Sequence, residues 1–142
     1  MTDQGDPLAR IAEALDRLAP PAVAPVDWTS APAYVWHGNA RPVERLIAPP
    51  LDLLQGIDAQ KAAVTGNVAR LAAGHAAHDM LLWGSRGMGK SALLRAAVLD
   101  AQGRDPGAIA LVQVAPEALD SLAALFAELG QQERRFLVFI DD

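Results

Sequence analysis

The sequence predicts an α/β fold in which a parallel sheet is flanked by helices. Three short apolar runs, at residues 80–83, 109–114 and 136–140, alternate with segments of helical periodicity. Runs that are apolar at every position are typical of parallel strands covered on both faces. Ahead of these runs, the chain has an expected N-terminal helix followed by a proline-rich segment.

The first element is expected to be a helix over residues 7–19. Leu8, Ile11, Leu15 and Leu18 recur at the spacing that places side chains on one face of a helix, and the charged residues fall largely off this face. Such a helix docks on its own domain or on a partner. Prolines at positions 20, 21, 25 and 32 then interrupt regular structure.

A second helix is expected over residues 58–74. Asp58 is the expected N-cap, because a short acidic side chain can accept a hydrogen bond from the first turn. Val64 and Val68 lie one helical turn apart on the same face. Gly74 supplies a stop signal, since glycine readily adopts the left-handed conformation that ends many helices.

The second half of the chain adds two more helices, and the first half a short strand. One helix is expected over residues 90–102, and the other over residues 116–129 with a proline in its first turn. The strand is expected over residues 34–38. The expected apolar face of the last helix consists of Leu119, Leu122, Phe126 and Leu129.

A phosphate-binding loop is the most specific motif of the sequence. Residues 84–91 read GSRGMGKS, which fits the pattern G-x-x-x-x-G-K-[ST] at every fixed position. The motif also has the context it requires, because it follows an expected strand and opens an expected helix. Glycines permit backbone angles and close approach that a Cβ atom would block. The alternative, a glycine-rich turn with a solvated lysine, requires neither the spacing nor the Lys-Ser pair.

Each part of the loop has an expected role. Backbone N–H groups from Gly87 to Ala92 can surround phosphate oxygens, and the helix that begins near Lys90 adds its positive end. Lys90 supplies a point charge for the β- and γ-phosphates, and the Ser91 hydroxyl can bind Mg²⁺. The expected nucleotide-binding residues are Gly84, Ser85, Arg86, Gly87, Met88, Gly89, Lys90, Ser91 and Ala92.

Two acidic residues follow the last apolar run. In P-loop proteins an acidic residue at this strand end holds the Mg²⁺ site, and Asp141 fits that role. Asp142 then occupies the position where many such ATPases carry a glutamate that polarises the attacking water. The alternative is that both aspartates only end the strand and cap a turn.

With these residues the chain resembles the AAA+ ATPases, and more narrowly the bacterial family catalogued as domain of unknown function 815. The similarity is carried by GIDAQKAAVTGNVARLAAG, HDMLLWGSRGMGKSALLRA and RRFLVFIDD, and it runs from Leu46 to the last residue. It implies that residues 46–142 are part of an ATP-binding AAA+ domain. Residues 1–45 would then be an N-terminal helix and a proline-rich linker.

The resemblance also implies an activity and partners. Lys90 and Ser91 would contact phosphate and Mg²⁺, Asp141 would be the acid of the metal site, and Asp142 would activate water for ATP hydrolysis. Hydrolysis would drive remodelling of a macromolecular partner, in a homo-oligomer whose neighbouring subunit lends an arginine finger. Related proteins continue past this strand with sensor residues and a helical lid. We therefore expect these 142 residues to be an incomplete portion of a longer protein. We also expect this portion to bind nucleotide poorly by itself.

Two other functions remain open. The chain could belong to another P-loop class, such as a GTPase or a small-molecule kinase, although it contains no guanine-specific Asn-Lys-x-Asp segment. It could also be a nucleotide-gated interaction module, in which bound ATP acts as a switch and hydrolysis is slow or absent.

Composition and charge argue against several other functions. The net charge of −5 does not indicate nucleic-acid binding, and the absence of cysteine excludes disulfides and thiolate metal sites. No apolar run approaches the length of a membrane-spanning helix, so we expect no membrane partner and a cytoplasmic location. Side chains expected to be solvated rather than functional are His75, His78, Arg134 and Arg135.

Overall fold

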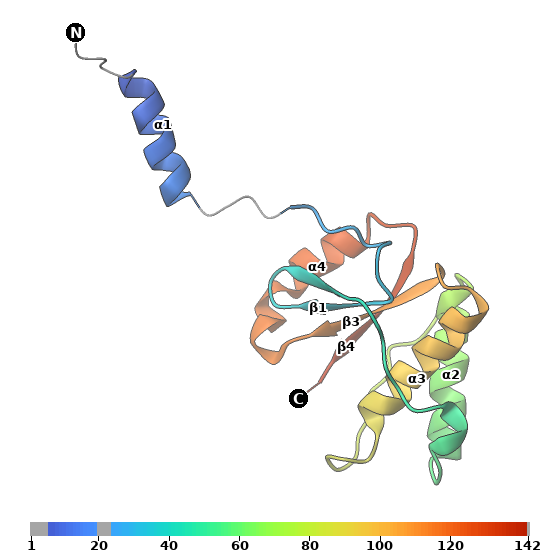
Figure 1. The fold of residues 1–142 in the computed structure, drawn as a ribbon. Helices are drawn as coiled ribbons and strands as arrows, with labels where there is room; N and C mark the ends of the chain where they lie inside the picture. Colours follow the sequence, from blue (N-terminus) through green and yellow to red (C-terminus); the bar gives the residue numbers. More distant parts are fainter. Residues whose placement is uncertain (1–5, 20–23, 142) are drawn as a thin grey trace.

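The protein forms a four-stranded sheet with helices on both faces, as the sequence predicts (Figure 1). The structure is a computed structural model, and it describes residues 6–19 and 24–141. Its elements in chain order are α1 (Pro7–Leu18), β1 (Ala33–Trp36), β2 (Ala40–Val43), η1 (Leu51–Leu53), α2 (Asp58–Ala72), α3 (Lys90–Arg104), β3 (Ile109–Val114), η2 (Pro116–Ser121), α4 (Leu122–Leu129) and β4 (Arg135–Ile140).

The sheet is mostly parallel, with the strand order β2-β1-β3-β4. β3 pairs in parallel with β1 on one side and with β4 on the other, whereas β2 pairs antiparallel with β1. Ala33 lies opposite Leu111, and Leu111 lies opposite Leu137. Because β1, β3 and β4 run in the same direction, their carboxyl ends meet at one edge of the sheet. Ligands of α/β folds bind at this edge of the sheet.

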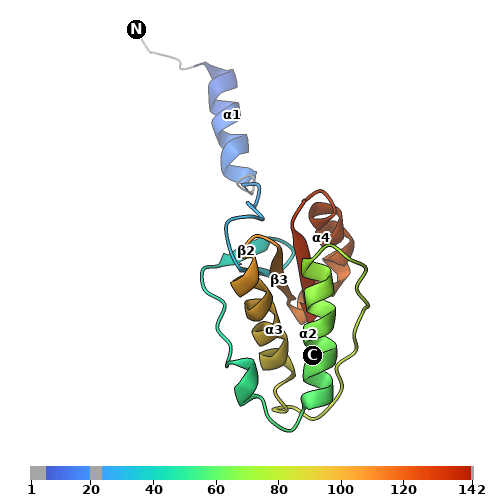
Figure 2. The same ribbon diagram turned by 90° about the vertical axis from the view of Figure 1, so that its right-hand side faces the viewer.

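Alternating residues of the strands fill two apolar cores on opposite faces of the sheet. On one face, Ile109 and Leu111 of β3 pack beneath α2 and α3, which lie side by side (Figure 2). On the other face, Ala110 and Val112 pack with η2, α4 and the segment before β1. Every second residue of β3 therefore faces the same core, and burial on both sides explains why every residue of the strand except Gln113 is apolar.

The β1–β2 hairpin adds two strands ahead of the segment for which a domain was predicted. The sequence predicted a strand over residues 34–38, and β1 lies slightly earlier; β2 was not predicted. Pro42 lies in β2, which is an edge strand, so the absence of an N–H group in proline costs no hydrogen bond of the sheet. Both strands fall within residues 1–45, yet they are hydrogen-bonded into the same sheet as β3 and β4. The predicted division at residue 46 itself stays a prediction.

The strand predicted over residues 80–83 is not formed. Leu81 and Trp83 are each 88% exposed, and residues 79–83 pair with no strand among the described residues. Both sides of β3, the central strand, are occupied by β1 and β4. The outer edge of β4 has no partner strand among the described residues, yet residues 79–83 do not pair with it. The prediction was wrong because an apolar run becomes a strand only when it pairs with a neighbouring strand.

The helix predicted over residues 116–129 is divided. The first six residues form the 3₁₀ helix η2, and only the last eight form α4. A 3₁₀ helix has about three residues per turn instead of 3.6, so the apolar face changes direction at the junction. As a result, Leu119 and Phe126 are exposed, whereas Leu125 is completely buried and Leu129 is buried. The predicted face was therefore only partly correct.

The N-terminal helix was predicted correctly, but no other part of the chain that the structure describes buries it. Asp6 caps α1 by accepting a hydrogen bond from the backbone N–H of Leu8 at 3.1 Å. None of the residues of α1 is buried, and Figure 2 shows the helix standing away from the sheet and its flanking helices. No helix within residues 6–19 and 24–141 is long and apolar enough to cross a membrane.

Arg134 has a structural role that the sequence did not reveal. Its guanidinium donates hydrogen bonds to four backbone carbonyl groups, two in the segment before β1 and two around the start of β3. The distances range from 2.7 to 3.2 Å. The prediction of a solvated side chain was wrong because the acceptors are about 25 to 106 residues away in sequence, where no local pattern indicates them.

Candidate functional site

The glycine-rich loop adopts backbone angles that favour glycine at three positions. Gly84, Gly87 and Gly89 have φ angles of +144°, +81° and +81°. Residues with a Cβ atom rarely adopt these angles, so the glycines permit a loop path that other residues would resist. Within the loop, the N–H of Met88 donates to the carbonyl of Ser85 at 3.3 Å. The spacing of the motif thus corresponds to a specific loop conformation.

The loop leads directly into the N-terminus of α3. Gly89 is the N-cap residue, and its carbonyl accepts the first helical hydrogen bond, from Leu93 N–H at 2.8 Å. No side chain of the described residues caps this end of α3. The first-turn N–H groups, which include those of Ser91 and Ala92, therefore point toward the loop without an internal acceptor. A helix end of this kind favours an anion.

Lys90 is folded back onto the loop. Its Nζ donates a hydrogen bond to the Gly84 carbonyl at 2.6 Å, and its side chain is half-buried. The acceptor is a neutral carbonyl and not a carboxylate, so the positive charge of the amine is not neutralised by this contact. A phosphate oxygen entering the loop would meet this charge at close range.

Ser91 and Asp141 meet, although fifty positions separate them in the sequence. The Ser91 hydroxyl donates a hydrogen bond to Asp141 Oδ2 at 3.0 Å, in a half-buried position. Ser91 lies in the first turn of α3, and Asp141 directly follows β4 at the carboxyl edge of the sheet. The structure therefore brings the two predicted metal-site residues together at the mouth of the loop.

The structure shows no side-chain hydrogen bond between the other predicted site residues that it describes and Ser91 or Asp141. Ser85, Arg86 and Met88 are exposed and project from the loop, and Ala92 is half-buried in the first turn of α3. Asp142, the predicted water-activating residue, lies outside the described residues. Its role therefore stays a prediction.

Arg95 is a charged residue near the site that sequence reasoning missed. It lies one helical turn after Ser91 on the same face of α3. Its Nη2 donates to Oε1 of Gln113, near the carboxyl end of β3, at 3.3 Å. The available signal was the i, i+4 spacing from Ser91, which places a second cation on the side of α3 that faces the sheet edge.

The geometry offers oxygen ligands but no preformed metal cage. Within residues 6–19 and 24–141, no group of three or more His, Cys, Asp or Glu side chains could hold a metal ion. This finding does not conflict with a Mg²⁺ site, because Mg²⁺ is usually bound through one or two protein oxygens together with substrate phosphates and water.

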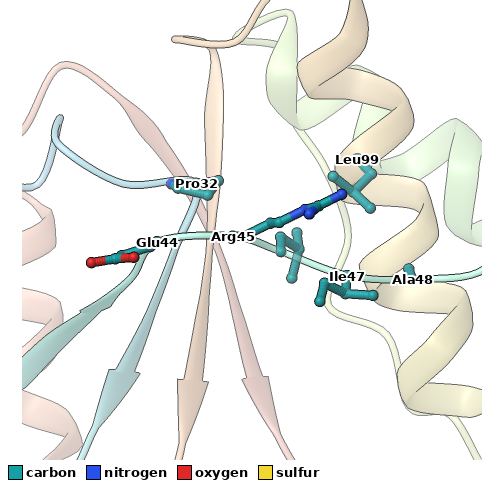
Figure 3. Close-up of a pocket in the computed structure, with 7 residues that line it drawn as sticks. Pro32, Glu44, Arg45, Ile47, Ala48 and Leu99 are labelled. Atoms are coloured by element: carbon teal, nitrogen blue, oxygen red, sulfur yellow. The ribbon is translucent and has the colours of Figure 1, made fainter.

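A hollow of about 440 Å³ lies elsewhere on the molecule, between the segment that follows β2 and α3 (Figure 3). Arg45 extends from that segment toward Leu99 of α3, and Pro32 closes one side. None of the phosphate-loop residues lines it. The hollow is open and mostly apolar, and it is not part of the site at the sheet edge.

Comparison with known families assigns the chain to a family with this loop. The family model described as "Protein of unknown function (DUF815)" matches residues 29–142. The chain belongs to the DUF815 family. DUF815 is an AAA-related family of P-loop ATPases, which confirms the resemblance found in the sequence. The DUF815 match begins upstream of Leu46 and includes β1 and β2. No curated protein and no solved structure matches the chain.

Proposed function

We propose that the chain binds ATP with Mg²⁺ at residues 84–92 and Asp141, and that the site hydrolyses ATP to ADP and phosphate. The observation that supports this most strongly is the 3.0 Å contact between Ser91 Oγ and Asp141 Oδ2 beside the glycine-rich loop. A turn that merely connected a strand to a helix would not require a hydroxyl and a carboxylate to converge there. Membership of DUF815 independently supports nucleotide binding.

The donor set fits Mg²⁺. Ser91 and Asp141 supply hydroxyl and carboxylate oxygens, which are the hard ligands that this ion prefers. Ser91 would bind the ion directly, and Asp141 would hold it directly or through a water molecule. Bound Mg²⁺ would neutralise charge on the phosphates.

The remaining residues would act on the phosphates and on water. Lys90 would exchange the Gly84 carbonyl for a β- or γ-phosphate oxygen, and the N–H groups of residues 87–92 would surround the same phosphates. Asp142 would orient a water molecule for in-line attack on the γ-phosphorus. The new bond forms from the water oxygen to phosphorus while the bond to the β–γ bridging oxygen breaks.

The family relationship suggests how the reaction is used. In AAA+ ATPases, hydrolysis drives the remodelling of a macromolecular partner, and the subunits form a homo-oligomer. We extend both properties to this chain as part of the proposal. Light scattering with and without MgATP would test the assembly, and a mass that stays monomeric in both conditions would contradict it.

Nucleotide binding can be tested through Trp83, which directly precedes the loop and is 88% exposed. The other two tryptophans, Trp28 and Trp36, are buried away from the loop, so a change in emission on adding MgATP would report on Trp83. Lys90→Ala is expected to weaken binding at least tenfold, because it removes the cation of the loop. Lys61→Ala is the matched control, since Lys61 is the other lysine of the chain and lies on α2.

Equal binding by wild type, Lys90→Ala and Lys61→Ala would reject the phosphate site. Hydrolysis is tested separately by phosphate release. Asp142→Asn is expected to retain binding and to lose most turnover. Binding without turnover in the wild type would instead support a nucleotide-gated interaction module.

A further inference from the structure

We infer that Asn67 is a positioning residue for the phosphate loop, acting through the backbone of His78. The inference rests on the proposed nucleotide site and adds a residue of α2 to it. The Asn67 side chain makes two hydrogen bonds to a single residue. Its Nδ2 donates to the His78 carbonyl at 2.6 Å, and its Oδ1 accepts from the His78 N–H at 2.8 Å.

This pair of bonds uses the Asn67 amide as a substitute for a neighbouring strand. A strand partner would satisfy one N–H and one C=O of an extended residue, and Asn67 satisfies the same two groups of His78. No strand among the described residues pairs with this part of the chain. The role that a sheet would have in holding the segment before the loop is therefore taken by a side chain of a helix.

Asn67 is the last of a series of contacts that guide the chain back along α2. After the turn at Gly74, the His75 N–H donates to the carbonyl of Arg70 at 2.9 Å, and Arg70 Nε donates to the carbonyl of Ala76 at 3.0 Å. Arg70 and Asn67 are three residues apart and share a face of α2. The two contacts therefore follow one another along the returning chain, first at Ala76 and then at His78.

Beyond His78, few contacts hold the chain until the loop is complete. Leu82 packs partly against the core beneath α2 and α3, whereas Leu81 and Trp83 are exposed. No backbone–backbone hydrogen bond joins residues 76–84 to the sheet within the described part of the chain. At its other end the loop is fixed by α3, whose Leu93 and Leu94 are buried. Lys90 holds the first loop residue by its hydrogen bond to the Gly84 carbonyl, and Asn67 provides the polar anchor on the segment that leads into the loop, where regular structure is missing.

Anchoring matters for affinity because a phosphate loop must have its N–H groups arranged before the ligand arrives. Each residue that is ordered only on binding lowers the affinity, since binding must then supply the cost of ordering it. When only a fraction of molecules has the competent loop, the apparent dissociation constant rises by the inverse of that fraction. Loss of the Asn67 contact is expected to act in this way, without removing any group that touches the nucleotide.

The test compares nucleotide binding and amide exchange in three variants. Asn67→Ala is expected to weaken MgADP binding roughly tenfold and to speed amide exchange at His78 and across residues 84–89. Asn67→Asp retains the acceptor for the His78 N–H but not the donor for its carbonyl, so it is expected to fall between Asn67→Ala and the wild type. Thr65→Ala is the matched control, because within residues 6–19 and 24–141 the Thr65 hydroxyl bonds only to carbonyls of its own helix, at 2.7 and 3.3 Å.

The outcomes separate this inference from the proposed function. Wild-type affinity together with unchanged amide exchange in Asn67→Ala would overturn the inference, and so would equal weakening by Thr65→Ala. If the wild type binds no nucleotide, the proposed function fails, and amide exchange alone then decides whether Asn67 positions the loop. Urea unfolding monitored by circular dichroism verifies that each variant is folded at the outset.

Discussion

Replacing Arg134 with methionine tests how the segments that lead into the neighbouring strands β1 and β3 are joined. The guanidinium of Arg134 donates hydrogen bonds both to the segment before β1 and to the start of β3. Methionine keeps most of the apolar stem and removes all five N–H donors. The substitution therefore isolates the hydrogen bonds from the packing of the side chain.

The expected loss of stability follows from the geometry. Three of the four hydrogen bonds lie in half-buried positions, and each contributes about 1 kcal/mol net. Nε is buried without a partner, and removing this unsatisfied donor offsets about 1 kcal/mol. The net destabilisation is then about 2 kcal/mol. With an m-value of about 2 kcal/mol/M in urea, the midpoint falls by about 1 M.

The assay is urea unfolding followed by far-ultraviolet circular dichroism. Arg135→Met is the matched control, because Arg135 is the exposed neighbour at the start of β4. Arg134→Lys is expected to be intermediate, since an ammonium cannot reach carbonyls on two segments with the spread of a guanidinium. Equal midpoints for Arg134→Met and Arg135→Met would refute the reasoning.

Two further predictions concern stability. Leu125→Ala is expected to cost about 3 kcal/mol in urea unfolding, because Leu125 is completely buried, and Phe126→Ala, at a 54% exposed position, is expected to cost less than half as much. The Thr29 hydroxyl and, next, its backbone N–H donate to Asp27 and hold the pKa of that carboxyl below its ordinary value. This interaction stabilises the fold above the unfolded pKa of Asp27 and is lost as pH falls through the folded pKa. Thr29→Val should therefore raise the pKa of Asp27 in a carboxyl titration by NMR, and an unchanged pKa would contradict this assignment.

Local sequence patterns correctly predicted β3 and β4, which have neighbouring strands in the fold. Residues 109–114, apart from Gln113, and residues 136–140 are apolar and form β3 and β4, because each strand has a parallel neighbour and a covered face. Residues 80–83 carry the same kind of pattern but pair with no strand among the described residues, and all of them except Leu82 are exposed. A strand forms only when two segments pair, and the sequence of one segment does not show whether the other is in place.

The same distinction applies to the candidate site. The loop follows from a local motif, so its positive φ angles could be expected from the glycine spacing alone. The approach of Ser91 to Asp141 could also be anticipated, because carboxyl ends of parallel strands meet the helix that starts at the same edge. The contact between Asn67 and His78 could not be anticipated from the sequence, because it depends on the direction in which the chain leaves α2.

The Ser91–Asp141 contact also has a consequence for the order in which the chain folds. α2 and α3 are close in sequence and pack together, so the loop between them can assemble early from local contacts. Asp141 reaches Ser91 only when β4 has paired with β3, and β3 also pairs with β1, which lies more than seventy residues upstream. These pairings close long stretches of chain and are expected to form late. A folding intermediate in which α2 packs on α3 and the loop is formed would therefore lack the carboxylate side of the site, so metal-dependent binding would appear only in the final kinetic phase.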